Sequence, residues 1–158
     1  MLNHHQVITQ ALLLVGLSGA ITACGHRMVS VATVYSSNQC SMVEPSVRSI
    51  DTPEQLDALR KTLKRKFSET QPLEQPIDLQ NQTLILYALG QKSTGGYSIN
   101  LLKDEAALKG QTLYLPLQLQ EPRADTFQTQ GITSPCQVYV IPKTEITRIE
   151  RVQNSGIK

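Results

Sequence analysis

The chain of 158 residues has the length of a single globular domain. Its 15 basic residues nearly balance its 13 acidic residues, which leaves a net charge of +2. With two Phe, five Tyr and no Trp, it also has few rings for base stacking, so we expect no nucleic-acid partner.

The chain opens with a leader-like segment. Residues 7–23 are mostly apolar but interrupted by polar and glycine residues, which is typical of a signal peptide and short for a permanent transmembrane helix. Residues 21–25 (Ile-Thr-Ala-Cys-Gly) resemble the bacterial lipobox, although residues 1–6 lack the usual Lys or Arg. The resemblance implies that residues 1–23 are removed and that Cys24 carries palmitate-like acyl chains. The alternatives are a plain secreted protein and an uncleaved membrane anchor.

A lipidated Cys24 predicts a lipoprotein of the cell envelope that faces the periplasm or the exterior. Gly25 after the cysteine favours the outer membrane in a Gram-negative cell. The membrane is then the first expected partner, reached through the N-terminal acyl chains. The sequence does not predict an oligomeric state.

The remaining cysteines and the histidines limit the chemistry. In an oxidising compartment, Cys40 and Cys136 are most simply joined in a disulfide; the alternative is two separately buried thiols. His4 and His5 leave with the leader and His26 lies next to the lipidation site. The folded domain thus has no histidine for a Ser-His-Asp or Cys-His site or a His-based zinc site, and we expect no catalytic residue, cofactor or metal.

Residues 24–46 are expected to form the lipidated N-terminus and a tether. Strand character at residues 29–35 is consistent either with pairing at a sheet edge or with a spacer that holds the domain off the bilayer. The globular domain is expected at residues 47–152, opening with a short strand at 47–50, and residues 153–158 are expected to be a flexible tail.

A helix is predicted to start at Pro53. Thr52 can act as its N-cap, Pro53 suits the first helical position, and Gln55 completes a capping box. The apolar stripe consists of Leu56, Leu59, Leu63 and Phe67. The basic residues within 60–66 lie opposite, either as a solvated face or as a surface for anionic lipid.

A buried strand is predicted at residues 83–89 and a half-buried strand at 97–101. Because the glycine-rich turn at 93–96 separates them, we expect a hairpin-like pair in the middle of a sheet. The loop at its tip is either a simple connection or a surface shaped for contact with another chain.

The later elements are also mainly strands. Residues 104–109 are predicted to form a bend or bulge. Residues 111–120 alternate strictly, and Pro116 within them predicts an edge strand or a bulge. Residues 136–141 form another strand, whereas 144–152 is a strand or a short helix. The fold class is thus α+β, mostly β: an antiparallel sheet or small sandwich of five to seven strands covered by one amphipathic helix.

Residues 90–97 (Gly-Gln-Lys-Ser-Thr-Gly-Gly-Tyr), followed later by Ser-Pro-Cys at 134–136, resemble the PrcB-like domain, the family of the protease complex subunit PrcB. The similarity covers about residues 50–152. It implies a non-catalytic accessory protein that associates with an exported protease or assists its assembly. The candidate residues for partner contact are Gly95, Gly96, Tyr97, Arg123, Ser134 and Pro135.

The sequence also bears on two other functions. Residues 94–97 are similar to the Thr-Thr-Gly-Phe/Tyr loop of chagasin-like inhibitors, which implies an exported peptidase inhibitor as the alternative. An enzyme using a carboxylate pair would need two convergent acids. Asp104 and Glu105 are the only adjacent acidic pair, and sequence neighbours on a strand point apart, so we predict no enzyme.

Overall fold

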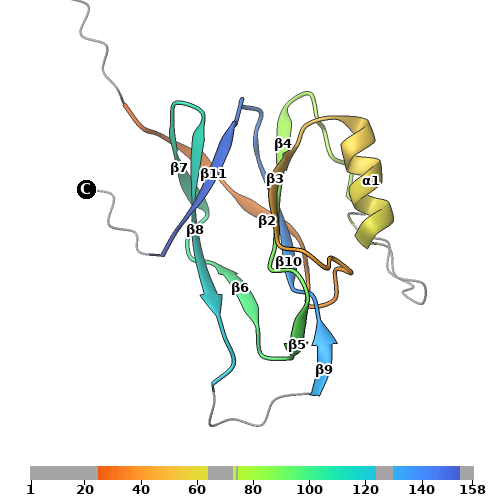
Figure 1. Cartoon of the computed structure of the whole chain (residues 1–158). Helices are drawn as coiled ribbons and strands as arrows, with labels where there is room; N and C mark the ends of the chain where they lie inside the picture. Colours follow the sequence, from red (N-terminus) through yellow and green to blue (C-terminus); the bar gives the residue numbers. More distant parts are fainter. Residues whose placement is uncertain (1–24, 64–72, 74, 124–129, 154–158) are drawn as a thin grey trace, which may run out of the picture.

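The computed structural model describes residues 25–63, 73, 75–123 and 130–153, which build three stacked layers (Figure 1). An outer sheet contains β1 (Arg27–Ser30), β7 (Glu105–Lys109), β8 (Thr112–Gln120) and β11 (Arg148–Val152), with β6 (Ser98–Leu101) beside the far end of β8. A central sheet contains β2 (Ala32–Ser37), β10 (Cys136–Pro142), β4 (Gln82–Ala88) and β3 (Ser46–Ile50), in that order. Helix α1 (Pro53–Leu63) covers the second face of the central sheet. A two-stranded ribbon of β5 (Lys92–Thr94) and β9 (Gln130–Thr133) closes one end.

The α+β, mostly β, class is confirmed, but the strand count was too low. Eleven strands lie within the described residues instead of five to seven. Most pairs are antiparallel, whereas β11 runs parallel to β8. This settles residues 148–152 as a strand.

The central sheet is buried on both faces. Along β4, Leu84 and Leu86 belong to the core beneath α1, whereas Ile85 between them belongs to the core beneath the outer sheet. On β10, Val138 and Tyr139 divide in the same way. Burial on both sides explains why residues 83–89 read as a continuous apolar run.

Helix α1 begins as predicted. The Gln55 amide donates to Thr52 Oγ1 at 3.3 Å, and Gln55 Oε1 accepts from the amides of Thr52 and Asp51, at 3.3 and 2.8 Å. This is the reciprocal geometry of a capping box. Leu56, Leu59 and Leu63 are all buried, whereas Phe67 lies outside the described residues.

The predicted hairpin of residues 83–101 is wrong. β4 pairs with β10 and β3 in the central sheet, whereas β6 pairs with β8 in the outer sheet. The turn between them therefore carries the chain from one sheet to the other. Periodicity identifies a strand but does not identify its partner, which is the reason for the error.

Residues 104–109 were expected to bend, but residues 105–109 form β7, with Ala106, Ala107 and Leu108 buried. Strand β8 is likewise central and not an edge: β11 lies along one side, and β7 and β6 share the other. Pro116 lies where the partner of β8 changes from β7 to β6. There the Leu102 amide donates to the Pro116 carbonyl at 2.8 Å; proline offers no N–H in return, and β6 ends at Leu101.

The division between a tether and a domain at residue 47 is also corrected. β1 pairs with β7 from Arg27 onward, and β2 pairs with β10. Val31, between these strands, is 3% exposed and donates its amide to the Asp104 carbonyl at 2.7 Å. Residues 27–37 thus link the two sheets, and of the two alternatives, pairing at a sheet edge is the one the structure shows.

Cys40 and Cys136 form a disulfide, with 5.9 Å between their Cα atoms. Both are buried, and the bridge fastens the loop after β2 to the start of β10. Within the described residues, no helix has the length and apolar character needed to cross a bilayer.

Replacing both cysteines of this bridge with alanine should lower the unfolding free energy of the protein comprising residues 25–158. The bridge closes a loop with a sequence separation of 96 residues, and disulfides typically contribute about 2–4 kcal/mol. Urea denaturation measures the loss, and the unmodified protein under reducing conditions serves as the control. A titratable thiol in the native oxidised protein would contradict the pairing.

Candidate functional site

Most of the predicted contact residues lie at one end of the molecule, below the sheets in Figure 1. We call this the ribbon end; it comprises residues 38–45, 90–97 and 130–135. Main-chain hydrogen bonds join its three segments: the Gln91 amide donates to the Val43 carbonyl at 2.9 Å, and the Ser134 amide to the Asn38 carbonyl at 2.8 Å. Lys92 lies opposite Thr133 in the ribbon itself.

Gly90 explains the first glycine of the motif. Its φ is +71°, and a Cβ at this position would lie 2.7 Å from the Pro45 nitrogen and 2.8 Å from the Val43 carbonyl oxygen. Backbone atoms cannot yield as a flexible side chain can. Residue 90 is therefore glycine because the 43–45 loop passes directly against it.

The Gly95-Gly96-Tyr97 turn leads out of β5. Gly96 has a φ of +89°, which favours glycine, and the turn brings the Lys92 ammonium to 5.2 Å from the centroid of the Tyr97 ring. Gly96 is exposed, and Gly95 and Tyr97 are partly exposed. These three predicted contact residues are placed where another chain can reach them.

Ser134 and Pro135 have a different place. Ser134 is only 5% exposed; its hydroxyl donates to the Met42 carbonyl at 2.7 Å and accepts from the Met42 amide at 3.0 Å. Pro135 is buried, and its carbonyl accepts from the Leu89 amide at 2.9 Å. Both residues hold the ribbon end together from inside and present little surface for a partner.

Arg123 is exposed and lies on the segment that leaves β8. Residues 124–129, which connect it to β9, lie outside the described residues, as does Cys24. Of the basic set at residues 60–66, only Arg60 and Lys61 fall within helix α1 as described. Arg60 approaches Asp57 at 3.8 Å and donates to the Leu73 carbonyl at 3.4 Å.

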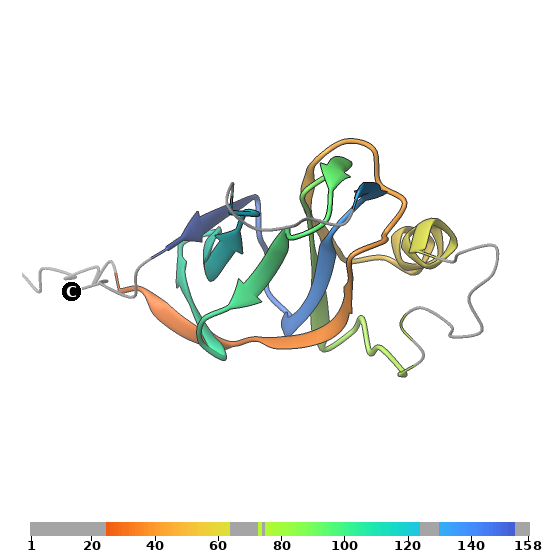
Figure 2. The same ribbon diagram turned by 90° about the horizontal axis from the view of Figure 1, so that it is seen from below.

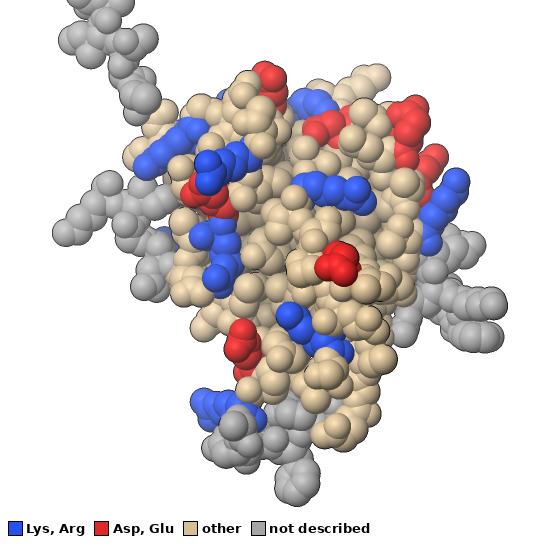
Figure 3. Space-filling view, in the orientation of Figure 1, with Lys and Arg blue, Asp and Glu red and all other residues tan. Residues whose placement is uncertain are grey.

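Two exposed apolar side chains at the ribbon end were not predicted from the sequence. Val43 is 65% exposed and Ile132 is 63% exposed, the two highest values among the large exposed apolar residues. Ile132 is an isolated apolar residue in a polar segment, which is a signal that could have drawn attention to it. On the face shown in Figure 3, acidic and basic side chains are interspersed with a large uncharged surface.

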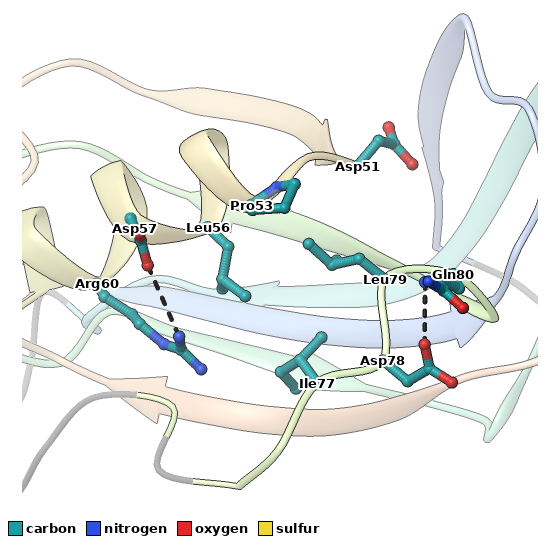
Figure 4. Close-up of a pocket in the computed structure, with 9 residues that line it drawn as sticks. All are labelled: Asp51, Pro53, Leu56, Asp57, Arg60, Ile77, Asp78, Leu79 and Gln80. Carbon is teal, nitrogen blue, oxygen red and sulfur yellow. Dashed lines mark hydrogen bonds and ion pairs between the residues drawn. The ribbon is translucent and has the colours of Figure 1, made fainter.

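A shallow groove of about 540 Å³ lies beside α1 (Figure 4). Leu56, Ile77 and Leu79 form an apolar floor, and charged groups surround it. Asp57 and Arg60 come from the helix, whereas Asp78 comes from the segment before β4.

Two of the three carboxylates that line this groove, Asp51 and Asp78, are committed to structural bonds. Asp51 accepts from the Thr83 hydroxyl at 2.9 Å and from the Lys143 ammonium at 3.2 Å. Partial burial alone would raise the pKa of the Asp51 carboxyl, but hydrogen bonds from Ser49, Thr83 and Lys143 and the Lys143 charge hold it below its usual value. In Asp78, a hydrogen bond from the Asn81 side chain, at 2.7 Å, and one from the Gln80 amide lower the carboxyl pKa.

These bonds leave the groove poorly suited to acid–base chemistry. Both carboxylates stay ionised at neutral pH, and neither is aimed at a nucleophile among the lining residues. Within the described part of the chain, no three His, Cys, Asp or Glu side chains are grouped to hold a metal ion. The ribbon end therefore remains the candidate functional site.

Comparison with known proteins supports the resemblance found in the sequence. Residues 83–142 match the family model described as PrcB C-terminal. The matched segment runs from β4 to the end of β10 and contains all six predicted contact residues. No curated protein and no solved structure matches the chain.

Gly90→Ala should destabilise the fold much more than Gly110→Ala. Both glycines have positive φ, +71° and +57°, but a Cβ at Gly110 meets no atom within 4 Å. The strained φ costs about 1–2 kcal/mol in each variant, and displacing the 43–45 backbone adds about 1–3 kcal/mol at residue 90 only. Thermal and urea unfolding of the two variants measure the difference; equal losses would contradict a tight approach at Gly90.

Asp51→Asn should lower the unfolding free energy at pH 7, and this loss should shrink as the pH falls below 3.8. Because the folded-state pKa of Asp51 is depressed below 3.8, its contribution is present above that pH and is lost as the pH falls through the folded-state pKa. The stability curves of Asp51→Asn and wild type should therefore converge in acid. Urea denaturation at several pH values tests this, and parallel curves would contradict it.

Proposed function

We propose that this protein is a membrane-anchored, non-catalytic accessory lipoprotein that binds an exported protease through its ribbon end. The match of residues 83–142 to the PrcB C-terminal model supports a role in association with a protease complex. Acylation at Cys24 would keep the protein in the cell envelope, in the outer membrane of a Gram-negative cell.

The observation that carries the proposal is the pair of exposed apolar side chains, Val43 and Ile132, at the ribbon end. The fully buried core of a protein interface is richer in apolar side chains than the rest of the surface, so these two side chains favour the ribbon end as the contact. Tyr97, stacked with Lys92 on the same end, adds the amphipathic aromatic that such interfaces favour.

The ribbon end is also held rigid before any partner arrives. The Cys40–Cys136 disulfide fastens its base, the buried Ser134 hydroxyl holds the 38–42 segment, and Gly90 packs directly against the 43–45 loop. Because little conformational freedom is left to lose, binding costs less entropy than with a mobile loop.

The interface can be tested with Val43→Asp and Ile132→Asp in the full-length protein. Each should reduce the amount of exported protease that co-purifies from detergent-solubilised native membranes by about tenfold, because a desolvated carboxylate costs about 1.4 kcal/mol or more. Leu102→Asp is the matched control, since Leu102 is 42% exposed but lies between β6 and β7.

Unchanged recovery of the protease with both ribbon-end variants, while their thermal unfolding matches wild type, would overturn the proposed interface. The inhibitor alternative makes a different prediction. The soluble protein comprising residues 25–158, added to exported cysteine proteases at micromolar concentration, would then block peptide hydrolysis. An accessory subunit leaves that hydrolysis intact.

A further inference from the structure

We propose that the outer face of the outer sheet rests on the bilayer surface, with an apolar patch centred on Met28 as the contact. This orientation depends on the proposed lipidation of Cys24. It specifies which surface of the domain faces the membrane.

The link between Cys24 and the folded domain is short. β1 begins at Arg27, so only Gly25 and His26 separate Cys24 from the fold. Two extended residues span at most about 7 Å. β1 cannot peel away to lengthen the link, because it pairs with β7 along its whole length and Val29 is buried in the core.

Apolar side chains lie on the surface next to this link. Met28 on β1 is 48% exposed, and Tyr114 on β8 and Val152 on β11 are partly exposed. Ala107, which is paired with both Met28 and Tyr114, and Pro116, which is paired with Val152, are themselves buried. Together with His26, Lys103 and Glu105 these residues line a shallow depression of about 120 Å³. The solvent face of an antiparallel sheet is normally polar, and here Met28, Tyr114 and Val152 add exposed apolar surface beside Lys103 and Glu105.

The polar groups around the patch suit the boundary between head groups and acyl chains. The Lys109 ammonium lies 5.7 Å from the centroid of the Tyr114 ring. Tyrosine and lysine both place an apolar body in the boundary and a polar end in water. Arg148 and Glu150 neutralise each other at 2.8 Å, so the contact relies on apolar burial more than on anionic lipid.

This orientation leaves the candidate interface accessible. The described chain begins at one extremity of the molecule and the ribbon end lies at another, as both ribbon views show (Figure 1, Figure 2). A domain lying on its outer sheet would therefore keep its ribbon end clear of the bilayer. An exported protease could then bind from the aqueous side.

The absence of tryptophan from the chain allows a specific test. Met28→Trp in the full-length lipidated protein, reconstituted into phosphatidylethanolamine/phosphatidylglycerol vesicles, places the single indole in the patch. Brominated lipid should quench its emission roughly twofold, since interfacial groups sit about 5–10 Å into the head-group boundary. Ile132→Trp, with its indole at the ribbon end, should keep its emission.

Mass spectrometry of the mature N-terminus comes first and shows whether Cys24 is acylated. Failure of the anchor can then be distinguished from failure of the orientation. An unmodified Cys24 overturns the anchor and this orientation with it. An acylated Cys24 without quenching in Met28→Trp overturns the orientation alone. Two measurements of Met28→Trp without vesicles test whether something other than lipid covers the patch, and either result would overturn the orientation. A change of indole emission on deletion of residues 154–158 indicates that the C-terminal segment covers it. A change of emission with protein concentration indicates that a second copy of the protein covers it.

Discussion

Burial of the central sheet on both faces is the constraint on which the rest of the structure depends. Its strands β4 and β10 send alternate side chains into two separate cores, one shared with α1 and one with the outer sheet. At about 25 cal/mol per Å² of apolar surface removed from water, these two interfaces provide the main stabilisation of the domain.

Polar groups inside this sandwich form hydrogen bonds with partners in the protein. The Tyr139 hydroxyl, between the sheets, donates to Gln137 Oε1 at 2.6 Å, and the Gln137 amide donates to the Ile99 carbonyl at 2.6 Å. Burial, with a smaller effect from Tyr87, raises the pKa of Tyr139, so the phenol stays neutral at any physiological pH. This chain of hydrogen bonds joins β10 to β6 and so links the central sheet to the strand that leads away from the ribbon end.

The sequence predicted local features well because their causes are local. The capping box of α1 lies within five residues, and the run at residues 83–89 needs only its own apolar side chains to be read as a buried strand. Partners were not predictable in this way: β4 and β6, separated by a short turn, belong to different sheets. The candidate site shows the same division, since the glycines of the turn were recognised, whereas the inward direction of Ser134 depends on a contact with Met42 far away in the chain.

The pairing of the first strands with late ones has a consequence for biogenesis. β1 finds its partner only when residues 105–108 are present, and β2 waits for residues 136–140. Topologies dominated by such distant pairs fold slowly, in the millisecond-to-second range for small domains. The sandwich therefore cannot close during synthesis until residues 136–140 are available to pair with β2.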